Sequence, residues 1–299
     1  MKTKISLRMI TLLASSLLLM GCSIPIAEGL TSSTPTSHPA QTATPFPPVP
    51  PSPTSLPTST ATVTPTPTPV FLSIAPGAVQ VPILLYHHVS SEMKDSQYSI
   101  NPEMFEQQIA WLHDNGYSSI NITTLANLIQ EGGKIPLRPV IITFDDGNLD
   151  VYQKAFPILK KYGFSATFYV VDNYINGKAM VTSDQLKELI QNGWEIGSHG
   201  NSHTDLTASG VDLMKEIRMA KLETEDRLGV TINSFAYPFG RVDPTVIDKT
   251  IRFGFTSAVG LGATSTHDRS SLFYLSRIEI ANGDSMDRFI SLLPWSGPN

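Results

Sequence analysis

Apolar, strand-like segments alternate with amphipathic helical segments over most of the chain beyond residue 79. The pattern predicts strands at residues 81–86, 140–144, 166–171, 194–197, 234–237, 256–259 and 274–280. Helices are predicted from the Asn101-Pro102 cap, from Thr123, and over residues 183–191 and 211–228. Such alternation favours parallel βα units, and about seven or eight of them would form a closed or nearly closed β/α barrel. Functional residues of such a barrel gather at the carboxyl ends of the strands.

The amino-terminal segment has the pattern of an export signal. Basic residues precede a short apolar stretch at residues 10–20, which is typical of a signal peptide. The stretch ends in Leu19-Met20-Gly21-Cys22, which resembles a bacterial lipobox. That resemblance implies cleavage before Cys22 and lipidation of its thiol. We therefore predict a lipoprotein signal peptide at residues 1–22 and an extracytoplasmic protein that is lipid-anchored to a bacterial membrane.

Residues 23–76 are rich in Pro, Thr and Ser. Such a composition cannot bury a core and favours an extended, solvated chain. At ~3.1 Å per residue, this tether would reach on the order of 100 Å or more. The folded domain is then predicted at residues 77–299.

Charge and cysteine content narrow the class of protein. The net charge of −5 argues against a nucleic-acid partner, which would require a basic face. The single cysteine excludes an intramolecular disulfide. We expect a monomer whose contact with the membrane is its lipid anchor.

Two motifs with metal-site chemistry follow predicted strands. Thr143-Phe144-Asp145-Asp146-Gly147 places adjacent carboxylates in different directions, so that they can take different roles. Ser198-His199-Gly200-Asn201-Ser202-His203 carries two imidazoles four residues apart, which could meet on one face of a helical turn. Two His and one carboxylate would bind a metal and leave positions open for water and substrate.

A third motif, Phe235-Ala236-Tyr237-Pro238-Phe239-Gly240, ends another predicted strand. Its aromatic side chains could form the wall of a sugar groove. A free backbone N–H after Pro238 could face a developing oxyanion. A core strand followed by a Pro-Gly turn is the plainer interpretation of the same run.

Together, these residues resemble the polysaccharide deacetylase family, the NodB-like carbohydrate esterases, over about residues 79–293. T-F-D-D-G followed by H-x-x-x-H is specific to that family. The F-A-Y-P-F-G run and the early Leu85-Tyr86-His87-His88-Val89 are similar to the branch that includes poly-N-acetylglucosamine deacetylases. The resemblance implies an α/β fold, a distorted, incomplete (β/α) barrel of about seven units.

The resemblance also implies roles for individual residues. Asp146, His199 and His203 match the ligands of one divalent metal ion, with zinc as the usual ion. Asp145 matches the catalytic base. Phe239 matches the residue whose backbone amide helps hold the oxyanion. Tyr237 and Pro238, which precede it, are further candidates for binding the substrate or the oxyanion.

The sequence departs from the family pattern at the catalytic acid. The usual carboxyl-terminal Leu-x-His is Leu275-Ser276-Arg277 here. We expect His87 to supply the acid instead and Arg277 to hold Asp145 in an ion pair. We expect His88 to be peripheral and His113 and His267 to be solvated.

The expected function is metal-dependent removal of N-acetyl groups from a cell-surface polysaccharide that contains N-acetylglucosamine. An O-acetyl esterase acting on xylan or another acetylated glycan is an alternative, because an alcohol leaves with less help from an acid. A catalytically inactive glycan-binding lipoprotein and a structural surface tether are the non-enzymatic alternatives. Both leave a complete set of base and metal ligands without a use.

Overall fold

The computed structural model describes residues 70–295. The signal peptide, Cys22 and most of the predicted tether lie outside the described residues, so those predictions remain untested. Within the described part, no helix has the length and apolar character to cross a membrane.

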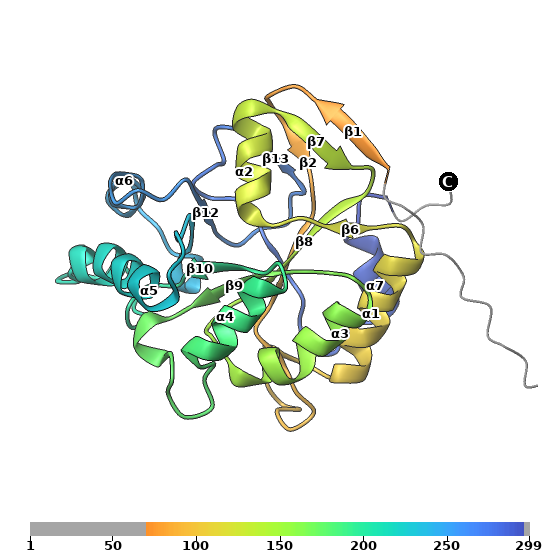
Figure 1. Ribbon diagram of the computed structural model, residues 1–299, viewed down its shortest axis with the longest axis horizontal. Helices are drawn as coiled ribbons and strands as arrows, with labels where there is room; N and C mark the ends of the chain where they lie inside the picture. The colour runs from red at the N-terminus through yellow and green to blue at the C-terminus, as the bar shows by residue number, and fades with distance from the viewer. Residues whose placement is uncertain (1–69, 296–299) are drawn as a thin grey trace, which may run out of the picture. The chain divides into compact units, whose positions relative to one another are not determined.

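A parallel sheet forms the centre of the domain, with the strand order β12-β11-β10-β9-β8-β3-β14 and β6 paired to β8 outside that order. Its strands are β3 (Ile83–Tyr86), β6 (Ser118–Ser119), β8 (Pro139–Phe144), β9 (Thr167–Val170), β10 (Glu195–Ser198), β11 (Ser234–Ala236), β12 (Ser257–Val259) and β14 (Ile278–Glu279). The sheet curls into an open half-barrel (Figure 1). The predicted distorted, incomplete β/α barrel is therefore confirmed.

Helices connect these strands. The α-helices are α1 (Pro102–Asp114), α2 (Ile122–Glu131), α3 (Phe156–Lys161), α4 (Ser183–Gln191), α5 (Ala220–Leu228), α6 (Pro244–Arg252) and α7 (Met286–Ser291). Two π-helical segments, η1 (Val151–Ala155) and η3 (Met214–Met219), lead directly into α3 and α5, and short 3₁₀ turns are η2 (Asp172–Tyr174) and η4 (Pro238–Gly240). The remaining short strands are β1 (Phe71–Ile74), β2 (Val79–Gln80), β4 (His88–Val89), β5 (Ser99–Ile100), β7 (Gly133–Pro136) and β13 (Thr266–His267).

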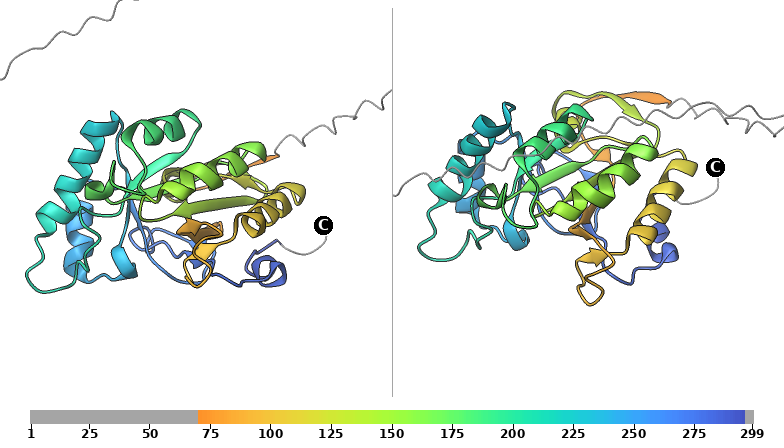
Figure 2. Two further views of the ribbon diagram at one scale, coloured as in Figure 1. Left: turned by 90° about the horizontal axis from the view of Figure 1, so that it is seen from below. Right: turned by 60° about the horizontal axis from the view of Figure 1, so that its bottom comes forward.

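Side-chain alternation along the strands gives the sheet two apolar faces. On β8, Ile142 and Phe144 pack with the core that includes α1, α3 and α4, whereas Ile141 packs with the core of α2. Helices α1, α3 and α4 lie on one side of the sheet, and α2 lies on the other with β1 and β7 (Figures 1 and 2). Because both faces are covered, the central strands read as nearly continuous apolar runs.

Local sequence signals explain where α1 begins and which face it buries. Asn101 caps α1, its side-chain oxygen accepting from the Glu103 N–H at 2.8 Å, and Pro102 follows at the first helical position. Phe105, Ile109 and Leu112 are fully buried on one stripe of the helix, as its sequence spacing predicts.

The segment before β14 nearly closes the barrel. Leu275 forms an isolated parallel bridge with Val259 of β12, at one edge of the sheet. Three residues later the same segment becomes β14, which pairs with β3 at the opposite edge. The sequence predicts a strand over residues 274–280, but only Ile278–Glu279 is regular, because the segment leaves one edge to reach the other.

Two further predictions need correction. The helix expected over residues 211–228 is π-helical over Met214–Met219 and becomes an α-helix only at Ala220. Strand β1 lies inside the predicted tether and pairs with β7 in an antiparallel register that joins Phe71 to Pro136 and Ile74 to Gly133. The folded domain therefore includes Phe71, six residues before residue 77, where composition alone placed its boundary.

We predict that a chain beginning at residue 77 is less stable than one beginning at residue 70. The shorter chain loses the hydrogen bonds between β1 and β7. Because each backbone hydrogen bond contributes about 1 kcal/mol, this loss should lower the free energy of unfolding by about 1–3 kcal/mol. Urea unfolding of both chains would measure the difference. Identical unfolding midpoints would show that β1 adds nothing to the domain.

Candidate active site

The predicted site residues converge on one cavity of about 410 Å³ at the carboxyl ends of the strands. Its polar lining comes from several separate parts of the sequence and includes His87, His88, Ser96, Asp145, Asp146, His199, His203, Arg277 and Glu279. Apolar side chains that remain largely exposed surround this polar centre; they are Met93, Tyr98, Phe239 and Leu261.

Strand register brings Asp145 and His87 to neighbouring positions. Thr143 of β8 lies opposite Leu85 of β3, and the two strands are parallel. Because side chains alternate, Asp145 and His87, each two residues further along, follow on the same face. The Asp145 N–H donates to the Tyr86 carbonyl at 3.1 Å, which holds the two strand ends together.

Asp145 and Arg277 form a buried, two-pronged ion pair. Arg277 Nη1 donates to Asp145 Oδ1 at 2.6 Å, and Nη2 donates to Oδ2 at 2.7 Å. The two residues are only 2% and 1% exposed. Burial alone would raise the pKa of Asp145, but the charge and hydrogen bonds of Arg277 outweigh it and hold that pKa at about 2. Asp145 is therefore ionised, and its carboxylate is fixed in one orientation.

Arg277 is itself held on three sides. Its Nε donates to the Gly260 carbonyl at 3.1 Å, and its guanidinium carbon lies 5.4 Å from the centre of the Tyr169 ring. The Tyr169 ring in turn needs Gly197 of the neighbouring strand, because a Cβ there would lie 2.3 Å from a Tyr169 ring carbon. A glycine on β10 thus leaves room for the ring that supports the arginine.

Asp146, His199 and His203 have the geometry of a metal-binding triad. One ligand atom from each lies within 4.8 Å of the others. Asp146 Oδ1 is 3.6 Å from His199 Nε2 and 3.4 Å from His203 Nε2. Ligand atoms at about 2.0–2.1 Å around a tetrahedral ion are about 3.4 Å apart, so the three residues fit a zinc-like ion. The donor set of two imidazoles and one carboxylate suits such an ion equally well.

Both imidazoles are prepared to act as ligands. His199 Nδ1 lies 2.8 Å from the Ala236 carbonyl; that oxygen can only accept, so Nδ1 carries the proton and Nε2 is free for a metal. Burial lowers the pKa of His203, and the neighbouring His199 lowers it further. A neutral imidazole is the form that binds metal.

The H-x-x-x-H segment is not helical, contrary to the sequence prediction. Residues 199–203 form an irregular loop after β10. Gly200 has a φ of 84° and His203 a φ of 54°, and these two left-handed residues turn the second imidazole back toward the first. Asp146 (φ 76°) and Phe239 (φ 59°) are also left-handed, so three of the five non-glycine residues with positive φ in the described chain lie at this site. Such strain clusters at functional sites.

The F-A-Y-P-F-G run takes a different arrangement from the expected aromatic wall. Tyr237 is 1% exposed and stacks on Tyr274, and Pro238 is buried as well. Phe239 is 55% exposed, lines the cavity and packs against the ring of His203 at 4.6 Å. Within residues 70–295 no hydrogen bond engages the Phe239 N–H, which leaves it available to an oxyanion.

The two adjacent histidines after β3, His87 and His88, both line the cavity. His87 lies 4.9 Å from the Tyr98 ring, between centroids. His88, expected to be peripheral, also lines it and pairs with Asp150 at 2.7 Å through Nδ1. The hydrogen bond and charge of Asp150 raise the pKa of His88. His267 was predicted to be solvated, but it is buried. It is 1% exposed, and its Nε2 lies 3.1 Å from the Val81 carbonyl oxygen.

Several lining residues carried no signal in the sequence. Met93 and Tyr98 lie in the loop between β4 and β5, and Leu261 follows β12. They belong to no spaced motif, and only the fold shows that their loops border the cavity.

Comparison with known proteins agrees with this geometry. Residues 132–258, which include T-F-D-D-G, H-x-x-x-H and F-A-Y-P-F-G, match the family model for polysaccharide deacetylases. This match identifies residues 132–258 as a polysaccharide deacetylase domain. The predicted enzyme class, a polysaccharide deacetylase, is thereby confirmed.

Three relatives illustrate the likeness. YxkH of Bacillus subtilis (strain 168) is 29% identical over 211 residues, which cover 70% of this chain and 75% of that protein. A poly-beta-1,6-N-acetyl-D-glucosamine N-deacetylase of Staphylococcus aureus is 26% identical over 227 residues, 70% of this chain and 76% of that protein. The structure of the Streptococcus pyogenes deacetylase PplD, in complex with acetate, superposes with a TM-score of 0.66 at 28% identity and covers 72% of this chain and 98% of that one.

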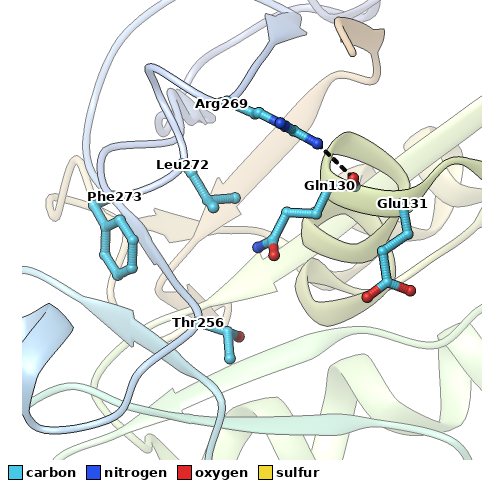
Figure 3. Close-up of a pocket in the computed structure, with 6 residues that line it drawn as sticks. All are labelled: Gln130, Glu131, Thr256, Arg269, Leu272 and Phe273. Carbon is cyan, nitrogen blue, oxygen red and sulfur yellow. Dashed lines mark hydrogen bonds between the residues drawn. The ribbon is translucent and has the colours of Figure 1, made fainter. Parts of the chain in front are cut away.

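A second and larger groove of this deacetylase, about 680 Å³, lies elsewhere (Figure 3). It is lined by Gln130 and Glu131 at the end of α2, by Thr256 just before β12, and by Arg269, Leu272 and Phe273. Arg269 Nη2 donates to the Gln130 carbonyl at 2.7 Å across it. The groove lies at the amino end of β12, opposite to the strand ends that carry the motifs, and barrel positions of that kind serve stability.

We predict strong coupling between Arg277 and Asp145 in a double-mutant cycle. Arg277→Met leaves a buried carboxylate unpaired, which should lower the free energy of unfolding by about 3–5 kcal/mol. Adding Asp145→Asn removes the charge, so the double variant should lose less than the sum of the two single changes.

The matched control is Arg288→Met, because Arg288 pairs with Asp284 on the surface and its side chain is 53% exposed. That change should cost less than about 1 kcal/mol. Simple additivity of Arg277→Met and Asp145→Asn would show that the buried pair is not energetically coupled.

Proposed function

We propose that the protein is a metal-dependent enzyme that removes N-acetyl groups from a cell-surface polysaccharide containing N-acetylglucosamine. The observation that carries this proposal is the meeting of the triad Asp146, His199 and His203 with the ion-paired Asp145 in one cavity. The Staphylococcus aureus relative named for deacetylation of poly-beta-1,6-N-acetyl-D-glucosamine supports the choice of substrate.

The three residues of the triad would hold one divalent ion, with zinc as the best match to their spacing. Such an ion, when bound, polarises a carbonyl oxygen and lowers the pKa of water. Asp145 Oδ2 lies 3.8 Å from His199 Nε2, so its carboxylate borders the same space. Asp145 accepts a proton from the attacking water, and Arg277 keeps the accepting oxygens in place.

The remaining steps fall to residues around the cavity. The free N–H of Phe239 donates to the oxygen that becomes negative when the acetyl carbonyl is attacked. His87, on the strand end beside Asp145, donates a proton to the departing nitrogen. An amine is a poor leaving group unless it is protonated, so amide substrates need this donor more than ester substrates do.

Acetate release tests the proposed function directly. N-acetylglucosamine oligomers should yield acetate faster than matched O-acetylated oligosaccharides. Chelation should stop turnover, and zinc should restore it. Full turnover by the metal-free protein would contradict the proposed metal dependence. A preference for O-acetyl groups would favour the esterase alternative.

We also propose that the enzyme is exported and lipid-anchored through Cys22, which the lipobox pattern motivates. A long Pro/Thr/Ser tether would then carry the domain toward a polymer outside the membrane. Cys22→Ser should abolish lipidation and move the mature protein from the membrane to the soluble fraction. Equal membrane partitioning of the two proteins would contradict the anchor.

We predict that substitutions of Asp145 and of His87 change the reaction rates on amide and ester substrates in different ways. Asp145→Asn keeps the shape and removes basicity, so rates on amides and on an aryl acetate should both fall by about 10²–10⁴-fold with metal content unchanged. His87→Ala should retain metal and lose rate on N-acetyl substrates far more than on the aryl acetate, because the latter releases a phenolate that leaves without being protonated.

His88→Ala is the matched control for His87→Ala. Both imidazoles line the cavity, but His88 Nδ1 is engaged by Asp150. Its removal should change amide and ester rates to similar extents. Near wild-type deacetylation of N-acetylglucosamine oligomers by His87→Ala would place the acid elsewhere.

A further inference from the structure

The two imidazoles of the triad are held in different ways. His199 has a direct partner, since its Nδ1 faces the Ala236 carbonyl at 2.8 Å. For His203, none of the hydrogen bonds formed within residues 70–295 reaches Nδ1, and its ring rests against Phe239. His203 also has a left-handed backbone, with a φ of 54°. Whatever fixes His203 must therefore act on the loop that carries it.

Glu216 holds that loop at the two residues before His203. Its Oε2 accepts from the Ser202 N–H at 3.0 Å, and its Oε1 accepts from Ser202 Oγ at 2.8 Å. Its own backbone carbonyl accepts from the Asn201 N–H at 3.1 Å. One residue thus makes three hydrogen bonds to consecutive positions of the H-x-x-x-H loop.

The environment makes these bonds strong and directional. Glu216 is only 7% exposed, so its carboxylate has little access to water. A buried carboxylate that accepts a backbone N–H and a hydroxyl together is fixed in orientation, and such charge-assisted bonds are stronger than neutral ones.

Glu216 lies in the π-helical segment η3, not in a regular α-helix. A π-helical turn contains an extra residue per turn, is rare, and occurs frequently at functional sites. Here it allows the neighbouring residues Glu216 and Ile217 both to be buried, one against the loop and one in the apolar core. The regular α-helical register that the sequence predicts for residues 211–228 is therefore interrupted at Glu216, the residue that contacts the loop.

We propose that Glu216 is the positioning residue for the metal ligand His203. This inference rests on the proposed metal site. With Ser202 and Asn201 held, the strained backbone of His203 keeps its Nε2 3.4 Å from Asp146 Oδ1, the spacing that a shared ion requires. Without the brace, that backbone is free to relax toward a more favourable φ and to carry the imidazole away.

The test is metal affinity, which does not depend on turnover. Zinc dissociation constants of the full-length protein are measured by competition with a chromophoric chelator. Glu216→Gln should weaken zinc binding about 10–100-fold, as the loss of outer partners of metal ligands does. Ser202→Ala removes one of the three bonds and should weaken binding by a smaller factor. Asp226→Asn, which changes an exposed carboxylate on α5, is the matched control and should leave affinity unchanged.

The absorption spectrum of the cobalt-loaded protein gives a second readout. At saturating cobalt, Glu216→Gln should alter the ligand-field bands because the His203 ligand is displaced, which a loss of stability alone would not do. Unchanged zinc affinity and an unchanged cobalt spectrum in folded Glu216→Gln would overturn the proposal. If that variant does not fold, Ser202→Ala decides, because Ser202 is exposed: wild-type affinity in Ser202→Ala then counts as refutation. A wild-type protein that binds no zinc would refute the metal site itself.

Discussion

The buried pair of Arg277 and Asp145 is the interaction on which the rest of the site depends. A guanidinium and a carboxylate that are both almost fully excluded from water are tolerable only when each satisfies the other. The two-pronged contact at 2.6 and 2.7 Å does so and fixes the carboxylate plane. Removing either partner leaves a buried charge, so the stability of the domain and the geometry of the site share one contact.

The irregular closure of the barrel explains how Arg277 reaches that position. A segment that paired fully with β12 would remain at one edge of the sheet. The chain instead bridges to Val259 at Leu275 and joins β3 at Ile278, so Arg277 lies in the crossing between the two edges. There its side chain points inward and contacts Thr143 and Asp145 at the end of β8. The incomplete barrel is thus the means by which a residue late in the sequence reaches the first motif.

Sequence patterns predicted the features that depend on neighbouring residues in the chain. The strand before Asp145 and Asp146 and the capped start of α1 each depend on a few adjacent residues, and both lie where expected. The H-x-x-x-H pair follows its predicted strand, but in an irregular loop and not in a helical turn. Apart from the Arg277–Asp145 pair, which was predicted from the sequence, features set by distant contacts were not predicted. Strand β1 forms because β7 offers it an edge, although its surroundings are rich in Pro and Thr. His267 is buried because β13 pairs with β2, and Glu216 turns inward through a π-helical segment that periodicity does not reveal.

The same contacts decide how two adjacent aspartates come to differ. Each oxygen of Asp145 accepts from Arg277, so the carboxylate cannot rotate to become a metal ligand without breaking a buried ion pair. Within residues 70–295 no arginine pairs with Asp146, and its left-handed backbone (φ 76°) directs its Oδ1 between the two imidazoles. Asp145 and Asp146 are chemically identical side chains at adjacent positions. They differ because Arg277 pairs with Asp145 and not with Asp146. Arg277, 131 positions after Asp146 in the sequence, therefore distinguishes the proposed base, Asp145, from the proposed metal ligand, Asp146.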